Sequence, residues 1–254
     1  MGETTVQSGR DQYDAIYRKD LAAEVEWLRL GATDKTDSIG FLLSQCGVTP
    51  DSILELGCGT GEVIKECQRR DYARRYAAID YSEPAIQYLR DNSKGIDISS
   101  GDIASSSFAI PGHFDVVVLS HVIEHLDKPD EMLKALSRID YSYLIAEVPL
   151  EDLPLCRLKS YLKDRTKNPA GHVQFFTAAS FKALLGNAGI RPIRSRRYFP
   201  RQPAERIRFM CRKNGWGTAK QWQALMTGRY LPMIFGPLWS RMYYSHLAVI
   251  CRKP

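Results

Sequence analysis

The sequence has no run of about 18 or more apolar residues, and its N-terminus lacks a basic segment followed by an apolar one, so it predicts neither a membrane-spanning helix nor an export signal. We therefore expect a cytoplasmic protein. Paired Cys-x-x-Cys spacing is missing among the six cysteines, which argues against a zinc ribbon and a disulfide framework. Internal repeats are also missing, and 254 residues with 44% hydrophobic content suffice for one domain with its own core.

Acidic residues are scarce late in the chain, and much of the net charge of +6 arises there. From Arg191 to Lys213 the only acid is Glu205, against Arg194, Arg196, Arg197, Arg201, Arg206, Arg208 and Arg212. Two interpretations remain open for this segment. It forms either a solvated face balanced by acids from elsewhere, or a site for phosphate, carboxylate, nucleic acid or membrane headgroups.

Three glycines at alternate positions, Gly57, Gly59 and Gly61, stand between the short apolar run at 52–56 and a helical pattern that starts at Val63. This order predicts a strand, a loop and a helix. Glycine adopts positive φ and leaves room for a ligand against the main chain, and the start of the helix suits the charged part of that ligand. A glycine loop alone, however, is compatible with several nucleotide cofactors.

Three further segments narrow the choice of cofactor. Asp80 ends a second apolar run about 20 residues after the glycines, where a carboxylate accepts both hydroxyls of a ribose. Gly101-Asp102-Ile103 follows a third apolar run, and residues 114–120 form a fourth.

With these four segments the chain resembles a class I S-adenosylmethionine-dependent methyltransferase, over roughly residues 50–200 and the last strand. Within that family it is most similar to the small-molecule branch, which includes the ubiquinone-pathway O-methyltransferases. The resemblance implies S-adenosylmethionine as cofactor and S-adenosylhomocysteine as product. It also implies that the cofactor contacts are Glu55, Gly57, Gly59 and Gly61 for the methionine part, Asp80 for the ribose, Asp102 and Ile103 for the adenine, and Tyr81 and Ser120.

Strands and helices alternate from Ile53 to Val148, which predicts an α/β fold with parallel pairing. The resemblance implies a Rossmann-like, seven-stranded and mostly parallel sheet with helices on both faces and an antiparallel last strand. We expect helices at 61–70, 83–92, 128–139 and 153–163, followed by a polar loop at 164–171. A fifth strand is expected at 141–148 and is ended by Pro149.

Two parts are expected to flank this sheet. Residues 1–48 form an N-terminal helical cover with helices at 11–30 and 36–46, on which Tyr13, Tyr17 and Trp27 are candidates to face the ligands. Residues 49–254 form the methyltransferase domain, with an aromatic, proline-broken insertion at 200–244 before the last strand. Because apolar surface this concentrated is seldom left open to water, the insertion is expected to be a lid, a homodimer surface or a membrane-facing patch.

Four polar residues are the candidates for catalysis: His121, Glu124, His125 and His172. The first three lie at positions i, i+3 and i+4, which places them on one face of a helical turn. In one interpretation, His125 or His172 is a general base that Glu124 orients.

In a second interpretation the four residues hold a divalent metal that acidifies the acceptor oxygen. Ubiquinone-type and small-RNA terminal methyltransferases carry an E-x-x-E-H motif here, and this chain has His121 in place of the first glutamate. Nitrogen in place of oxygen favours zinc, iron, cobalt or nickel over magnesium. A structural role for most of the cluster is the third interpretation.

We expect methyl transfer to a small-molecule acceptor, anionic or partly apolar and modified at oxygen. The alternatives are a 2′-O-methyltransferase for RNA termini and a cofactor-binding partner subunit without catalysis. Nucleic acid is not the expected partner, because no RNA-binding module is recognisable beside the basic segment.

Overall fold

Seven strands form one sheet in the order β3-β2-β1-β4-β5-β7-β6 in the computed structural model, which describes residues 9–103, 105, 108–160, 170–200 and 204–253. The strands are β1 Ser52–Leu56, β2 Arg75–Asp80, β3 Ile96–Ser100, β4 His113–Ser120, β5 Asp140–Leu150, β6 Arg191–Tyr198 and β7 Ser245–Arg252. Strands β1 to β5 pair in parallel, whereas β7 runs antiparallel to both β5 and β6. The Rossmann-like sheet with an antiparallel last strand is therefore confirmed.

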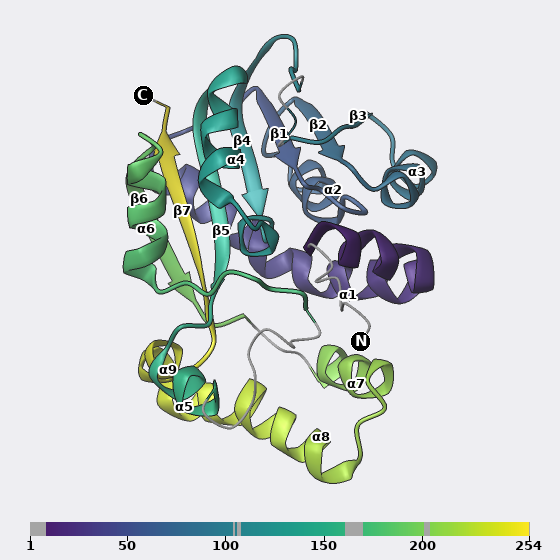
Figure 1. Ribbon diagram of the computed structural model, residues 1–254, viewed down its shortest axis with the longest axis vertical. Helices are drawn as coiled ribbons and strands as arrows, with labels where there is room; N and C mark the ends of the chain where they lie inside the picture. Colours follow the sequence, from purple (N-terminus) through teal and green to yellow (C-terminus); the bar gives the residue numbers. More distant parts are fainter. Residues whose placement is uncertain (1–8, 104, 106–107, 161–169, 201–203, 254) are drawn as a thin grey trace, which may run out of the picture.

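Helices cover both faces of this sheet (Figure 1). On one face α1 (Gly9–Gln45), α2 (Glu62–Arg69) and α3 (Glu83–Asp91) pack on β1 and β2 through a buried cluster that includes Leu42, Ile64 and Ile86. On the other face lie α4 (Pro129–Ala135), the short 3₁₀-helix η2 (Leu136–Arg138) and α6 (Ala178–Asn187). The predicted helices in this part agree with the structure within two residues at most ends.

The N-terminal helices differ from the expectation of two helices separated at 31–35. Helix α1 continues through that segment, and its break lies instead at Asp20, with φ −156° and ψ 74°. The carboxylate of Asp20 accepts a hydrogen bond from Ala23 N at 3.0 Å and so caps the second part of the helix. A glycine at 31 costs only about 1 kcal/mol relative to alanine, which the burial of Ala32, Ile39 and Leu42 outweighs.

Strand β5 also differs from the expectation, because Pro149 does not end it. The strand runs to Leu150, and Pro149 lies opposite His246 in the antiparallel pairing with β7. The backbone N–H and C=O groups of successive residues in a strand point to opposite neighbouring strands, so those of Glu147 and Pro149 point to the same side, toward β4. Glu147 is the last residue of β5 that pairs with β4. Proline has no N–H to donate, but β4 no longer pairs with β5 at this position, so no hydrogen bond of the sheet is lost.

Between β5 and β6 the structure describes α5 (Pro154–Ser160) and α6. The rest of the helix expected at 153–163 and most of the loop expected at 164–171 lie outside the described residues. Thr177 begins α6 with a reciprocal cap, in which Ser180 N donates to Thr177 Oγ1 at 3.0 Å and Thr177 N donates to Ser180 Oγ at 2.9 Å.

The insertion between β6 and β7 is helical, with α7 (Ala204–Lys213), α8 (Thr218–Leu225), the π-helix η3 (Met226–Tyr230) and α9 (Leu231–Met242). Helix α9 is interrupted at Gly236, with φ 48° and ψ −126°, directly before Pro237. Trp222, Met233, Ile234 and Leu238 are exposed on these helices. The roles of lid, dimer surface and membrane-facing patch therefore stay predictions.

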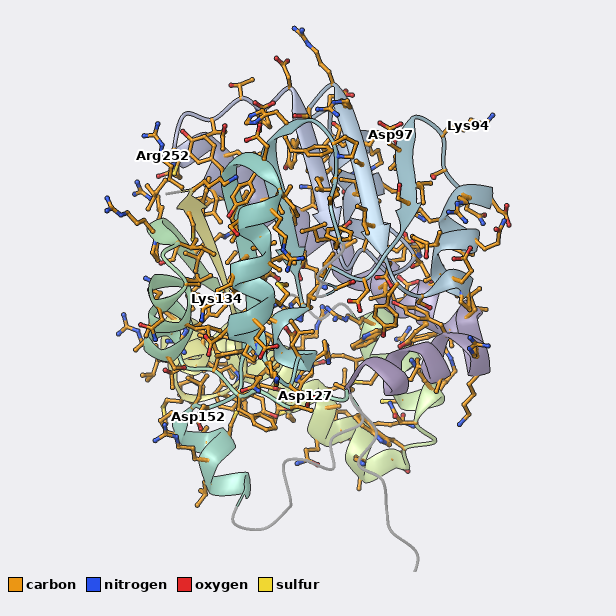
Figure 2. All side chains as sticks on the ribbon, turned by 45° about the horizontal axis from the view of Figure 1, so that its top comes forward. Lys94, Asp97, Asp127, Lys134, Asp152 and Arg252 are labelled. Atoms are coloured by element: carbon orange, nitrogen blue, oxygen red, sulfur yellow. The ribbon has the colours of Figure 1, made fainter. Side chains whose placement is uncertain are left out.

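The insertion lies beyond the carboxyl ends of the parallel strands, beside the first part of α1 (Figure 1). Figure 2 shows Asp127 and Asp152 toward this end of the molecule, and Lys94 and Asp97 toward the other. No helix in the described part of the chain is long and apolar enough to cross a membrane.

Candidate active site

The glycine loop joins β1 to α2 as expected and turns sharply against its neighbours. Gly57, Gly59 and Gly61 have φ of 68°, 53° and 74°. A Cβ atom on Gly59 would lie 2.4 Å from the hydroxyl of Tyr17, and one on Gly61 would lie 2.4 Å from Leu89. Helix α1 therefore packs directly on the loop, and no larger residue fits at either position. The side chain of Tyr13 lies outside the described residues.

The carboxylate of Asp80 holds this loop in place. Its Oδ2 accepts a hydrogen bond from Gly59 N at 2.7 Å, and its Oδ1 accepts one from Ser82 N at 2.9 Å. Asp80 is 6% exposed and ends β2 beside the glycines. Acceptance of ribose hydroxyls by the same carboxylate stays a prediction.

Glu55 points into the protein rather than along the loop surface. It is 2% exposed, and its Oε2 accepts a hydrogen bond from Ile64 N at 2.9 Å, at the start of α2. Burial raises the pKa of Glu55 to about 8. The contact with Ile64 supports the helix start, whereas contact with the methionine part of a cofactor stays a prediction.

Two buried hydroxyls near the loop fit a polar cofactor. Thr60 Oγ1 and Ser120 Oγ accept and donate no hydrogen bond within the described residues, although Thr60 is 0% and Ser120 is 8% exposed. Buried hydroxyls normally have partners, so the pair marks a place where a polar ligand would satisfy them. Ser120 is one of the predicted cofactor contacts.

The predicted adenine contacts lie beyond β3. Asp102 lines a cavity of about 360 Å³ together with Ile79, Gly101 and Phe108. Ile103 packs against the buried core from the same loop, and Tyr81 is half-buried after β2. The contacts of Asp102 and Ile103 with the adenine, and of Tyr81 with the cofactor, stay predictions.

The histidines depart from the predicted helical turn. Only Ile123–His125 form a 3₁₀-helix, η1, and His121 precedes it in the left-handed conformation with φ 60°. A non-glycine residue there is uncommon. His121 N donates to Glu147 O at 3.0 Å, which continues the β4–β5 pairing, and the ring of His121 contacts Glu147 and His246. The four predicted residues consequently fall into two groups of candidate ligands, which the 3.0 Å contact between His121 Nδ1 and Glu124 Oε1 joins.

The first cluster joins His121 to Glu147 of β5 and His246 of β7. His121 Nε2 lies 3.2 Å from Glu147 Oε1 and 3.2 Å from His246 Nδ1, and the latter two atoms are 3.3 Å apart. Tyr198 donates its hydroxyl hydrogen to Glu147 Oε1 at 2.8 Å, and Tyr244 Oη lies 2.9 Å from His246 Nε2. Burial lowers the pKa of His246 to about 3. Burial opposes ionisation of Glu147, but hydrogen bonds with His121 and His246 lower its pKa overall.

The second cluster holds Glu124, His125 and His172. His125 Nε2 lies 3.9 Å from Glu124 Oε1, and the rings of His125 and His172 have centroids 4.9 Å apart. Val173 N and Gln174 N donate to Glu124 O at 2.9 and 3.0 Å, which fixes the segment after His172 beside η1. Burial lowers the pKa of His125 to about 4. Despite its burial, Glu124 has its pKa lowered to about 2 because histidines, His121 first, surround it.

His172 has a partner that sequence reasoning missed. Its Nδ1 lies 2.5 Å from Glu151 Oε2, and His172 is 8% exposed. Burial alone would lower the pKa of His172, but the contact with Glu151 raises it overall. Glu151, and not Glu124, therefore orients this ring.

Glu147 and His246 were also missed, although a signal for both exists in the sequence. Each interrupts an otherwise apolar strand, Glu147 in the run that ends at Val148 and His246 in the run that ends at Cys251. A charged or titratable group on a buried strand requires a partner. Tyr198 and Tyr244 carried no comparable signal.

A second cavity, of about 450 Å³, lies between the end of β5 and the insertion. Its walls include Glu151, Phe199, Met210, Trp216 and Tyr244. The acceptor is expected at this end of the sheet, because ligands bind outside the carboxyl ends of the strands in open α/β folds.

The basic segment at 191–213 is partly packed rather than wholly solvated. Arg196 donates to Asp37 O at 2.7 Å and lies over the ring of Phe41. Arg206 is buried against Trp27, with 4.5 Å between its guanidinium carbon and the ring centroid. Trp27 thus contacts α7.

Two curated relatives are O-methyltransferases, and both match only part of the chain. The mitochondrial ubiquinone biosynthesis O-methyltransferase of Saccharomyces cerevisiae is 27% identical over 86 residues, which is 33% of this chain and 28% of the relative. The malonyl-[acyl-carrier protein] O-methyltransferase of Halalkalibacterium halodurans is 30% identical over 92 residues, or 34% of each chain. The match thus spans about a third of the length of these relatives.

Solved structures share the fold over most of the chain. The magnesium protoporphyrin IX methyltransferase from Synechocystis, with bound S-adenosylhomocysteine, superimposes with a TM-score of 0.56 at 19% identity. That comparison covers 96% of this chain and 94% of the other. The family model described as "Methyltransferase domain" matches residues 15–195. The chain therefore belongs to this methyltransferase family, the class I S-adenosylmethionine-dependent methyltransferases.

Proposed function

We propose that this enzyme methylates a small-molecule acceptor at oxygen, with His172 as the general base and the acceptor in the 450 Å³ cavity. The observation that carries the proposal is the position of Glu151, which lines this cavity and contacts His172 Nδ1 at 2.5 Å. The pairing links the base to the space for the acceptor. Both curated relatives act on oxygen according to their names, which favours the same acceptor atom.

Each residue has a distinct task in this proposal. A carboxylate only accepts hydrogen bonds, so Glu151 holds the hydrogen on Nδ1 of His172, and Nε2 is the nitrogen proposed to take the acceptor's proton. His125, whose low pKa keeps it neutral near pH 7, bounds the site without competing for that proton. When bound, S-adenosylmethionine supplies the methyl group as an activated sulfonium substituent.

The cofactor is proposed to lie at the glycine loop. Asp80 would hold the ribose, and Gly59 and Gly61 would admit the ligand to the backbone. The hydroxyls of Thr60 and Ser120 would gain hydrogen-bond partners. Helix α1, whose Tyr17 contacts Gly59, would act as the cover that residues 1–48 were predicted to form.

The acceptor is proposed to be partly apolar. Phe199, Met210 and Trp216 supply apolar wall, whereas Glu151 and Tyr244 supply polar groups at one side. An aromatic or aliphatic body with a single hydroxyl on the side of Glu151 matches this lining. Residues of α7 and α8 contribute part of the wall, so the insertion acts as a lid in this proposal.

The test is a screen of phenols, hydroxy acids and aliphatic alcohols by release of S-adenosylhomocysteine, followed by His172→Ala with the best acceptor. Turnover should fall by about 10²–10⁴, the usual loss for a positioned base. Affinity for S-adenosylhomocysteine should not change. His113→Ala is the matched control, because His113 is 46% exposed and belongs to neither cluster. Full turnover in His172→Ala would exclude the base.

A further inference from the structure

Three donor atoms converge where β4 ends beside β5 and β7. His121 Nε2, Glu147 Oε1 and His246 Nδ1 are separated by 3.2, 3.2 and 3.3 Å. A first-row divalent ion bound at about 2.0–2.2 Å holds neighbouring donors about 2.9–3.5 Å apart in octahedral or tetrahedral geometry. The three atoms therefore already have the spacing of a ligand set.

The far side of each imidazole lies against a polar group, Glu124 at ion-pair distance for His121 and Tyr244 at hydrogen-bond distance for His246. His121 Nδ1 lies 3.0 Å from Glu124 Oε1, and His246 Nε2 lies 2.9 Å from Tyr244 Oη. Two lone pairs at 3.0 Å would repel, so Nδ1 of His121 carries the hydrogen. When Nε2 of His246 donates to Tyr244, both converging nitrogens present lone pairs to Glu147.

The charge around this cluster also favours a cation. Glu124 is 0% and Glu147 is 2% exposed. Neither carboxylate forms an ion pair with a lysine or arginine of the described residues, and only histidines lie within ion-pair distance of them. The charge of Lys35 acts on both carboxylates without forming an ion pair with either, so a divalent ion at the cluster would add the short-range positive charge that they lack.

The backbone of His121 supports the same inference. Its left-handed φ of 60° is an uncommon conformation that costs about 1–2 kcal/mol for a residue other than glycine. In this conformation its ring stands between Glu124 and Glu147 rather than against His125. Strain of this kind persists where a functional constraint maintains it.

We infer that the enzyme binds one first-row divalent ion through His121, Glu147 and His246, at a site separate from the Glu124–His125–His172 cluster. Two imidazoles and one carboxylate suit zinc, iron, cobalt or nickel better than magnesium or calcium. Tyr198 Oη, 2.8 Å from Glu147 Oε1 and 3.1 Å from His246 Nδ1, is placed as a fourth donor. The ion would tie together β4, β5, β6 and β7 at the end of the sheet next to the acceptor-side cavity.

Calorimetric titration of Zn²⁺ into the EDTA-dialysed full chain tests this site without reference to methyl transfer. Wild type should bind one equivalent, and Co²⁺ should give visible absorption bands without a thiolate charge-transfer band. His246→Ala and Glu147→Gln should weaken binding by about 100-fold or more, since losing even an orienting partner costs about 10–100-fold. His172→Ala and His113→Ala should bind as wild type does.

Several outcomes would overturn the inference. The absence of saturable binding by wild type, or wild-type affinity in a folded His246→Ala variant, would leave the cluster as a hydrogen-bonded network. Binding lost in His172→Ala but kept in His246→Ala would place the ion in the other cluster. If His246→Ala does not fold, His121→Asn replaces it, because that ligand is the most accessible, with a side chain 16% exposed.

Discussion

Replacement of Asp80 by asparagine should separate the two tasks that this carboxylate performs. Its oxygens accept hydrogen bonds from Gly59 N at 2.7 Å and from Ser82 N at 2.9 Å. Asparagine has one carbonyl oxygen and therefore satisfies only one of these two donors. The other N–H would be left facing an amide group that donates as well.

The magnitudes follow from burial and charge. Hydrogen bonds to a charged group contribute about 1.5–3 kcal/mol, and an unsatisfied buried donor costs about 1–3 kcal/mol. Asp80→Asn should therefore lower the free energy of unfolding by about 1–3 kcal/mol. Loss of the charged acceptor for the ribose should weaken S-adenosylhomocysteine binding by about 1.5–3 kcal/mol, or roughly 10- to 150-fold in Kd.

Calorimetry with S-adenosylhomocysteine and urea denaturation measure these two quantities on the same preparation. Asp97→Asn is the matched control, because Asp97 is an exposed residue of the neighbouring strand β3 and lies toward the other end of the molecule (Figure 2). It should change neither quantity. If Asp80→Asn binds S-adenosylhomocysteine as tightly as wild type, the placement of the ribose at Asp80 is wrong.

Further predictions concern the loop, the buried histidine and the insertion. Gly61→Ala should lower the free energy of unfolding in urea more than the control Gly215→Ala does. Both glycines have positive φ, 74° and 59°, but a Cβ atom would meet a neighbour only at Gly61, where Leu89 would lie 2.4 Å away. The control should therefore cost only the about 1–2 kcal/mol of the backbone conformation. The pKa of His125 is about 4 in the folded state and about 6.5 in the unfolded state, so the unfolded chain takes up the proton first as pH decreases. The contribution of His125 to the free energy of unfolding should therefore be full above pH 6.5 and should fall by up to about 3 kcal/mol toward pH 4. If His125→Gln loses as much stability as wild type over this pH range, His125 is not the cause. Trp216→Ala should raise KM for the acceptor and leave the affinity for S-adenosylhomocysteine unchanged, because Trp216 lines the cavity. Trp222 is 61% exposed and does not line the cavity, so Trp222→Ala should alter neither quantity. Equal effects of the two substitutions would show that the insertion is not the cavity wall.

The pH profile of turnover gives a fifth test, specific to the proposed base. Glu151 raises the pKa of His172, and a base is active only when neutral, so turnover should rise with pH through a pKa above the usual value for histidine. Glu151→Gln should shift that rise to lower pH. An unchanged profile in the variant would rule out Glu151 as the orienting group.

The sequence alone predicted the sheet and the cofactor loop, because short local patterns in the sequence indicate both. Apolar runs of strand length, glycines at alternate positions and an acid at the end of the second strand are each read within a few residues. The strand pairing then followed from the preference of alternating strands and helices for parallel connection. The antiparallel last strand came from the family resemblance.

Local pattern failed in helix α1 and at the turn that contains His121, because contacts with distant residues decide both. The break in α1 depends on whether Asp20 or Gly31 interrupts the helix, and packing of Ala32, Ile39 and Leu42 against the core decides it. The spacing of His121, Glu124 and His125 indicated a helical turn, but the pairing of His121 N with Glu147 O extends the sheet by one residue and delays the helix.

The partners of the histidines were decided by the tertiary structure alone. His121 meets His246 across 125 positions of sequence, and His172 meets Glu151 across 21 positions. The two residues of each pair lie on different elements, so the repeat of a single helix or strand could not predict that they meet. His121 and His246 meet because the sheet places the end of β4 and the start of β7 on either side of β5, whose buried Glu147 contacts both rings. His172 lies beside η1 because Val173 N and Gln174 N donate to Glu124 O.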